Sequence, residues 1–256
     1  MDAVKKGFGI ATKGLGLVLV MIVFNMVWNL ASIPLNIAPG ATPTPQLTMA
    51  VVIFSLLFIL TSIFVQGGAL GSVRDYIKEG KIKLASFAPY GMKYYLKLLG
   101  VGILIILIIA IVALIAGLII AGTAPLNNVV VTDVAIVIAI AIGVIAGFLY
   151  FVPLALAPYA LVSDDLGVIA SMKKSIRVTR PLVKTFLLLL LFIILILISV
   201  AVALIIGFLA GLAIAAMPVM AGKIFMAVLT SIINGYLGIV MMGSFMTYYL
   251  TLSRAK

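Results

Sequence analysis

The charged segment VSDDLGVIASMKKSIRVTRPLVKTF (162–186) holds the side chains of this chain that are best placed to do chemistry. It begins with two adjacent carboxylates, Asp164 and Asp165. Paired carboxylates can hold a metal ion or transfer protons, but neighbouring residues on a helix point to different faces. We therefore expect Ser163 to cap a helix and the two acids to lie in its first turn, where the helix dipole favours anions. No catalytic or metal-binding residue is predicted.

The cations of this segment follow on the same predicted helix. Leu166, Ile169, Met172 and Ile176 recur at helical spacing and predict one apolar stripe, and Pro181 ends the helix. A basic amphipathic helix of this kind lies at a membrane surface. The cations either bind anionic lipid head groups or an acidic partner protein, or they only set the membrane topology. With two cations from the similar segment 72–97, the candidate binding residues are Lys173, Lys174, Arg177, Arg180, Lys184, Lys93 and Lys97.

Composition limits the enzymatic possibilities. The chain has no Cys, no His and six carboxylates, so it lacks the commonest nucleophile, general base and transition-metal ligands. We predict a non-enzymatic protein without a cofactor. Membrane lipids are the expected partners, together with a protein partner or a second copy of the chain, and no nucleic acid.

Four polar side chains are expected inside the membrane, where polar groups are costly and suggest function. Asn25 and Asn29 share one face of a helix, and Asn234 and Tyr236 lie midway along another. They either line a polar cavity of a small-solute or ion transporter or channel, or they form hydrogen bonds between helices.

The high content of hydrophobic residues indicates that the elements carrying these side chains are membrane-spanning helices. Hydrophobic residues make up 66% of the 256 residues and charged residues 9%, against about 25% charged in soluble domains. Runs of about 20 apolar residues cross a membrane as helices. We predict an all-α, multi-pass membrane protein with a single domain over 1–256 and spans at 14–33, 48–65, 98–121, 134–162, 186–212 and 224–250. The length of the run 14–33 favours a retained span over a signal peptide.

The charges predict the orientation of these spans. Residues 1–13, 66–97, 163–185 and 253–256 account for the whole net charge of +11, because the remaining charged residues, Lys223 and Asp133, cancel. By the positive-inside rule both termini are cytoplasmic, in the cell membrane. Tyr94, Tyr95, Tyr248 and Tyr249 are expected at the cytoplasmic interface.

Two spans carry signs of irregularity. Pro153 and Pro158 each remove a backbone donor and predict a kink near the cytoplasmic end of the fourth span. The fifth apolar run extends well beyond one upright crossing, so we expect it to tilt or to break near Gly207 and Gly211.

The segments 71–105 and 157–194 share one plan: a span ends, a serine precedes an acid, a basic stretch follows, and a proline leads into the next span. The N-terminal segment VKKGFGIATKGLGLVLVMIV is similar to the second half of that plan. We interpret the chain as three parallel repeats, each a basic interfacial segment followed by a helical hairpin. Inverted repeats mark many secondary transporters, so parallel repeats argue against transport.

The segment FVPLALAPYALVSDDLGVIASMKKSIRVTRPLVKTFLLLL (151–190) resembles the glycerophosphodiester phosphodiesterase membrane-domain-like proteins, six-helix proteins of bacteria and archaea. The resemblance departs from their pattern at Ile176 and at Pro181-Leu182. It implies the six-helix fold without the phosphodiesterase activity, because the catalytic domain fused to some relatives is not found in this sequence. The matching positions are Pro153, Leu166, Gly167, Ala170, Ser175, Arg177, Thr179 and Arg180.

Overall fold

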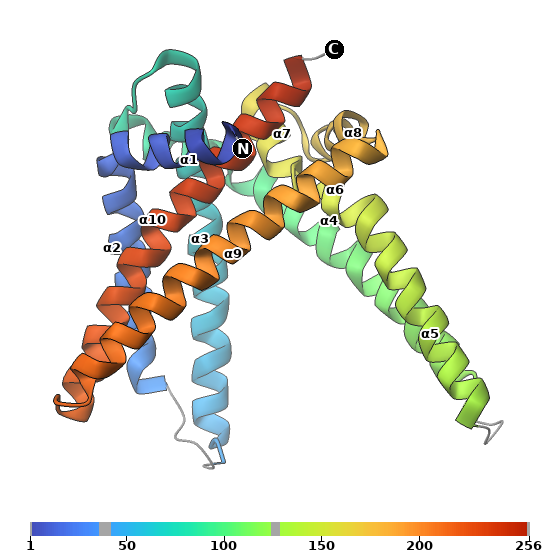
Figure 1. Cartoon of the computed structure of the whole chain (residues 1–256), viewed down its shortest axis with the longest axis horizontal. Coiled ribbons are helices and arrows are strands. Elements are labelled where there is room, and N and C mark those ends of the chain that lie inside the picture. Colours follow the sequence, from blue (N-terminus) through green and yellow to red (C-terminus); the bar gives the residue numbers. More distant parts are fainter. Residues whose placement is uncertain (1, 36–41, 124–128, 255–256) are drawn as a thin grey trace. The chain divides into compact units, whose positions relative to one another are not determined.

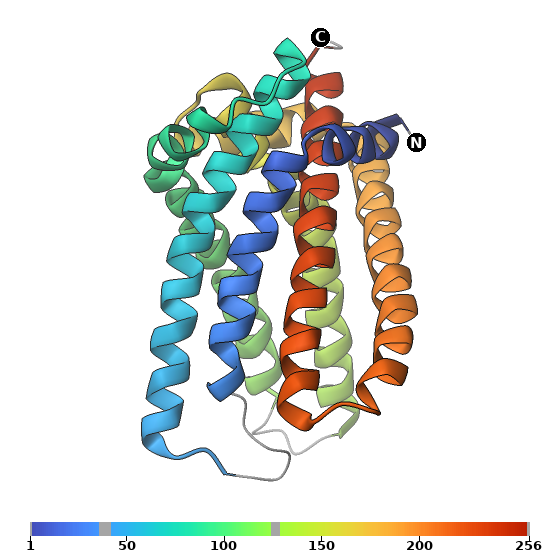
Figure 2. The same ribbon diagram turned by 90° about the vertical axis from the view of Figure 1, so that its left-hand side faces the viewer.

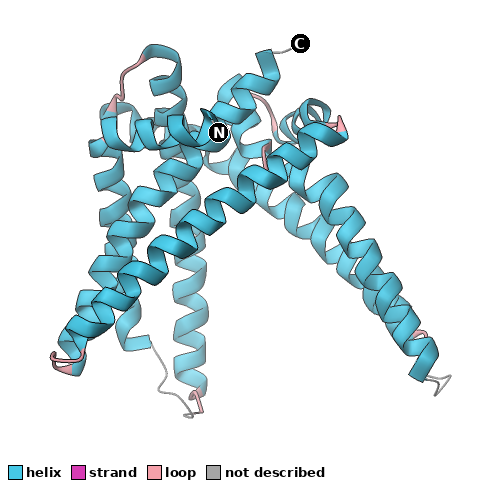
Figure 3. Cartoon of the chain, viewed as in Figure 1, coloured by secondary structure: helices cyan, strands magenta, loops and turns pink. Residues whose placement is uncertain are grey.

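The structure is a computed structural model that describes residues 2–35, 42–123 and 129–254. These residues form helices joined by short turns, and none of them is in a strand (Figure 3). This confirms the predicted all-α class and six helical stretches long and apolar enough to cross a membrane. The stretches are Leu15–Leu35, Pro45–Glu79, Leu84–Ala121, Val129–Asp164, Leu182–Ile214 and Val219–Arg254.

The chain divides into two compact units. Unit 1 comprises 1–95 and 191–251, and unit 2 comprises 96–190 and 252–256. The prediction of one domain over 1–256 stays a prediction. The helices α4 (Phe87–Ala121) and α9 (Leu182–Ile214) each contribute residues to both units.

Unit 1 contains α1 (Asp2–Lys13), α2 (Leu15–Ser32), α3 (Pro45–Glu79) and most of α10 (Val219–Arg254). A short turn of 3-10 helix, η1 (Ile33–Leu35), follows α2, and another, η2 (Leu84–Ser86), precedes α4. The helix α1 lies across α10 and leads into the start of α2 (Figures 1 and 2).

Glycines make the close contacts of α10 possible. A Cβ atom at Gly7 of α1 would lie 2.5 Å from the carbonyl oxygen of Val240, and one at Gly235 would lie 2.8 Å from the backbone nitrogen of Ile22 in α2. Only residues without a side chain let these backbones approach so closely. The N-terminal and C-terminal parts of the chain therefore pack together in one unit.

Unit 2 contains the rest of α4, α5 (Val129–Ala146), a π-helical turn η4 (Gly147–Phe151) and α6 (Val152–Leu154). It continues with α7 (Ala157–Asp164) and α8 (Val168–Thr179), and α8 lies beside α7 (Figure 1). The single predicted fourth span is thus interrupted around Pro153 and Pro158, and Ala155 and Leu156 lie outside any helix. Each proline lacks the N–H that a regular helix needs at its position.

Two helix lengths differ from the apolar runs that predicted them. The helix α3 continues to Glu79, although the predicted span ended at residue 65. It ends where Gly80 adopts a left-handed conformation, with φ 73°, which is the usual role of glycine after a helix. The helix α9 runs without a break through Gly207 and Gly211.

The predicted cap at Ser163 is wrong. Ser163 and Asp164 form the end of α7, and Asp165 adopts the left-handed conformation, with φ 52° and ψ 42°. The next helix, α8, begins after Gly167, so none of Ser163, Asp164 and Asp165 lies in its first turn. The reason is local: a short polar side chain such as Asp tolerates the left-handed region, so the chain turns at Asp165 and two helices form instead of one.

Candidate anion-binding site

The buried face of α8 carries mainly hydroxyl groups, and the predicted apolar stripe lies beside this face. Ser171, Ser175, Val178 and Thr179 are buried, whereas Ile169 is 61% exposed. The hydroxyl of Ser175 donates a hydrogen bond to the carbonyl oxygen of Pro153, which lies just before the helix break. The stripe prediction left out this hydroxyl face, because the interrupted fourth span presents a backbone carbonyl that a serine, and not a leucine, can satisfy.

This packing turns the basic side of α8 toward a cavity in unit 2 of about 510 Å³. Three of the predicted binding residues, Lys173, Lys174 and Arg177, line it together, and apolar side chains complete the wall. The other lining residues are Leu166, Ala170, Val178 and Ser253.

The two acids of the segment hold cations at this site. Lys174 Nζ lies 2.6 Å from Asp164 Oδ2, and Lys97 Nζ lies 3.2 Å from Asp165 Oδ1. All four side chains are partly exposed, so each pair contributes about 0–1 kcal/mol. Lys173 and Arg177 are exposed and have no ion pair within the described part of the chain. The cavity therefore retains uncompensated positive charge.

The other four predicted binding cations do not line this cavity, and Lys97 is instead paired with Asp165. Arg180 is exposed beyond the end of α8, and Lys184 lies in the first turn of α9. Lys93 belongs to unit 1, where its Nζ lies 5.2 Å from the centre of the Tyr94 ring. The structure thus selects three of the seven predicted residues.

A buried charged cluster in unit 1 escaped the sequence analysis. Asp75 Oδ1 lies 2.7 Å from a guanidinium nitrogen of Arg74, and the hydroxyl of Tyr90 donates to Asp75 Oδ2 at 2.5 Å. Arg74 also donates to the hydroxyl of Tyr94 at 2.8 Å, and Tyr94 is fully buried. Tyr94 was expected as an interface anchor, and it instead binds a guanidinium. These contacts join the end of α3 to the start of α4.

The predicted intramembrane polar residues do not converge on one cavity. Asn25 donates to the backbone carbonyl of Met21 in its own helix, and Asn29 donates to the hydroxyl of Ser231 at 2.8 Å. Asn234 is exposed, and Tyr236 lies with its ring centre 6.3 Å from that of Phe8. Within the described residues, no three His, Cys, Asp or Glu side chains cluster where they could hold a metal ion.

No curated protein and no solved structure matches the chain. The resemblance to the glycerophosphodiester phosphodiesterase membrane-domain-like proteins stays a prediction. A family model described as a domain of unknown function, DUF7847, matches residues 1–252. Because this match covers nearly the whole chain, the protein belongs to the DUF7847 family.

Proposed function

We propose that this is a non-enzymatic membrane protein whose basic cavity on α8 binds the anionic head groups of lipids at the cytoplasmic surface. The observation that carries the proposal is the arrangement of Lys173, Lys174 and Arg177 around one cavity of about 510 Å³. A phosphate group accepts charge-assisted hydrogen bonds from several such donors at once. Basic clusters next to membrane helices favour anionic lipids by about 1 kcal/mol for each cation.

The exposed side of α8 supports a lipid ligand over a soluble anion. Ile169 is exposed, and Met172 and Ile176 follow it on the same side of the helix, next to the basic side. An amphipathic helix with this arrangement places its apolar residues among acyl chains and its cations among head groups. The apolar part of the cavity wall, Leu166 and Val178, continues this pattern.

The charge distribution supports six spans with both termini in the cytoplasm of the cell. The cation-rich segments are the two ends of the chain, the stretch around the turn after α3, and α8 with the residues that follow it, and these alternate with nearly uncharged turns along the chain. Short loops on the cytoplasmic side of a membrane carry an excess of Lys and Arg. The basic cavity then faces the leaflet that is rich in anionic lipid.

The contacts of the acids support the three-repeat interpretation. In unit 1, Asp75 near the end of α3 holds Tyr90 in the next segment. In unit 2, Asp164 at the end of α7 holds Lys174 in α8. In both repeats, an acid at the end of one hairpin thus binds the segment that leads into the next hairpin.

The alternative of a transporter or channel receives less support. It depends on Asn25, Asn29, Asn234 and Tyr236 facing one path, and the first two are engaged in hydrogen bonds while Asn234 is exposed. The contact of Asn29 with Ser231 matches the other interpretation, a hydrogen bond that joins two helices. We therefore place the function in the basic cavity.

The test compares lipid binding by the purified protein and by the double variant Lys173→Gln/Arg177→Gln. Native mass spectrometry in a neutral detergent measures bound phosphatidylglycerol against phosphatidylcholine. We expect the original chain to prefer phosphatidylglycerol over phosphatidylcholine. In the variant this preference should be about tenfold smaller, which corresponds to about 1.4 kcal/mol. Raised salt should reduce the preference of the original chain.

The matched control is Lys5→Gln/Lys6→Gln, which removes the same charge from exposed positions on α1. It should keep the preference, because these residues line no part of the cavity. Equal preference in the cavity variant and the original chain would contradict the proposal. Capture of an acidic protein without any lipid preference would favour a protein ligand instead.

A further inference from the structure

A second cavity, in unit 1, lies between the end of α2 and the start of α10. Its volume is about 540 Å³, which falls in the range of small-molecule sites. It is about 25 Å along α2 from Gly14, where α2 begins. The residues that line it are Asn29, Ser32, Ile33, Ile214, Met217, Val219, Gly222, Lys223, Met226, Ala227 and Thr230.

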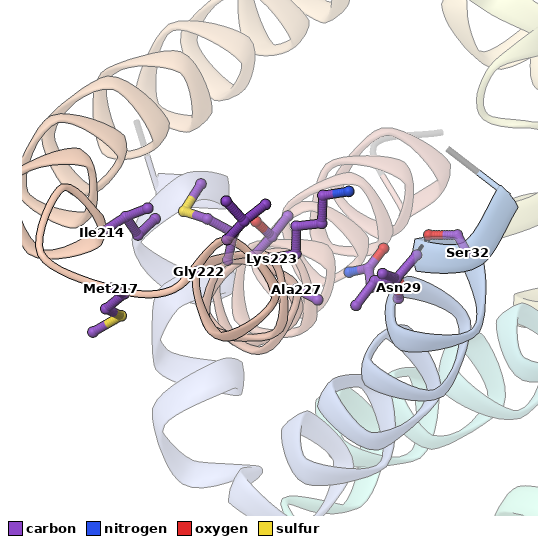
Figure 4. A pocket seen from close by; sticks show the side chains of 11 residues that line it. Asn29, Ser32, Ile214, Met217, Gly222, Lys223 and Ala227 are labelled. Atoms are coloured by element: carbon purple, nitrogen blue, oxygen red, sulfur yellow. Dashed lines mark hydrogen bonds between the residues drawn. The ribbon is translucent and has the colours of Figure 1, made fainter. Parts of the chain in front are cut away.

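The polar groups of this cavity gather on one side. Figure 4 shows Lys223, Asn29 and Ser32 on the side of α10 that faces α2, and Ile214 and Met217 on the other side. The orientation of Asn29 is fixed, because its amide donates to Ser231 and the Ser231 hydroxyl donates to the carbonyl oxygen of Ala227 at 2.6 Å. The cavity thus has a polar wall and an apolar wall.

Lys223 brings a positive charge to a part of unit 1 that contains no acid. The carboxylates of unit 1, Asp2, Asp75 and Glu79, lie in α1 and at the far end of α3. Within the described residues Lys223 forms no ion pair. Lys223 is exposed at the cavity and has no acidic neighbour to offset its charge, so its ammonium can donate charge-assisted hydrogen bonds to an anionic ligand.

The apolar wall indicates the rest of the ligand. Ile214, Met217 and Met226 offer flexible hydrocarbon and thioether surface next to the cation. Gly222 keeps this surface close to α10, since a Cβ atom there would lie 2.8 Å from Ile214 Cγ2. A small inorganic anion would leave this wall unused, whereas an acyl chain would cover it.

We propose that this cavity binds an amphipathic anion with an acyl chain, held by Lys223 and Asn29 at its head group and by Ile214, Met217 and Met226 along its chain. The head group is a carboxylate or a phosphate, since either accepts hydrogen bonds from an ammonium and an amide. The site is separate from the basic cavity on α8, and the proposal does not depend on lipid binding there.

The fluorescence of Trp28 can be used to measure binding in this cavity. This residue is the single tryptophan of the chain and directly precedes Asn29. A fatty acid brominated in its acyl chain quenches nearby tryptophan fluorescence. Titration of the protein in neutral detergent should give saturable quenching. The Lys223→Gln change should raise the midpoint, the fatty-acid concentration at half-maximal quenching, about tenfold, which corresponds to the loss of about one charge-assisted hydrogen bond. The methyl ester of the same acid should bind the original chain as weakly as the acid binds the variant.

Three variants make the result specific. Lys223→Arg keeps the charge and should restore the midpoint, which separates loss of binding from loss of folding. Lys6→Gln removes a charge at the other end of the same unit and should change nothing. Lys173→Gln/Arg177→Gln should also leave the midpoint unchanged, so failure of this proposal can be told apart from failure of the lipid proposal for α8.

Competition identifies the head group. Displacement of the quencher by an unbrominated fatty acid or by a lysophosphatidic acid supports the proposal and shows which head group binds better. The proposal is overturned by an unchanged midpoint in Lys223→Gln, by equal binding of acid and ester, or by displacement with inorganic phosphate alone at millimolar concentration.

Discussion

Asp75 shows how a single carboxylate can be buried near the end of a long apolar helix. Its two oxygens accept from Arg74 and from Tyr90, and its side chain is only 8% exposed. Removal of a charged group from water costs several kcal/mol unless partners compensate it. Here the guanidinium and the phenol provide that compensation, so the cluster depends on all of its members.

We expect Asp75→Leu to destabilise the protein by about 2–3 kcal/mol, because it leaves the Arg74 guanidinium buried without its counter-charge. Thermal unfolding in detergent, followed by circular dichroism, measures the loss. The control is Glu79→Gln, which breaks the exposed pair with Lys83, whose atoms lie 2.9 Å apart. That change should cost less than about 1 kcal/mol. Equal losses in both variants would contradict a special role for the buried cluster.

The same exposed pair raises the pKa of Lys83, through its hydrogen bond and its charge interaction with Glu79. This side chain is exposed, so the effect on stability is small. The sign is that of a raised pKa: the contribution of the pair is complete below the pKa of the unfolded chain and disappears as the pH rises through the folded value.

The contact between Asp75 and Tyr90 could not be predicted from the sequence, because a turn brings the two residues together. They are 15 positions apart, and they lie on different helices joined through η2. Nothing in the residue types says that the start of α4 returns to the end of α3. The cations Lys173 and Arg177 were predictable, because four residues on a helix place both on one face.

At the scale of the element, glycine allows α1 to pack closely against α10. Val4, Gly7, Ile10 and Ala11 form its buried face, and Gly7 and Gly243 are in close contact. The exposed Lys5 and Lys6 lie on the other side. The position of the helix therefore depends on a missing side chain.

We expect Gly7→Val to displace α1 from α10, since any Cβ atom at this position meets backbone atoms. The chain has no cysteine, so a single Val4→Cys change gives a unique label site. A maleimide should label Val4→Cys slowly in the original background and rapidly together with Gly7→Val. Gly9→Val is the control, because a Cβ atom there meets nothing within 4 Å. Fast labelling in the Gly9→Val background would contradict the expected docking.

The helix α8 shows what an amphipathic pattern leaves out. The sequence predicted an apolar stripe through Ile169 and Met172 at a membrane surface, and it gave no sign of the buried hydroxyl face beside that stripe. This face packs against the interrupted span around Pro153, whose carbonyl oxygen accepts from Ser175. The prolines predicted the irregularity, but its effect on the facing helix follows only from three-dimensional contact.

At the scale of the whole molecule, the six apolar stretches were predictable because the thickness of a membrane sets the length of its helices. Their ends were not, because helices such as α3 continue into charged sequence, where apolar runs give no signal. The proposed orientation follows from charge alone and is open to a direct experiment.

We expect Val219→Cys to react with a membrane-impermeant maleimide added to intact cells, and Lys81→Cys to react only after the membrane is opened. Both positions are exposed in the structure. Val219 begins α10 and Lys81 lies in the turn after α3, and the positive-inside rule assigns these two places to opposite sides. Lys5→Cys should behave as Lys81→Cys does. Labelling of Lys81→Cys in intact cells would show that the orientation is reversed.

The pairing of α1 with α10 has a consequence for synthesis in the cell. Residues 2–13 leave the ribosome about 230 residues before Gly243, and translation adds roughly 5–20 residues each second. The helix α1 therefore waits about ten to fifty seconds for its partner. Unit 2 is continuous in sequence apart from its last residues, so it can assemble during this delay. During that time the apolar side chains of Val4 and Ile10 are not yet buried against α10, and the nearest apolar surface that can bury them is the lipid.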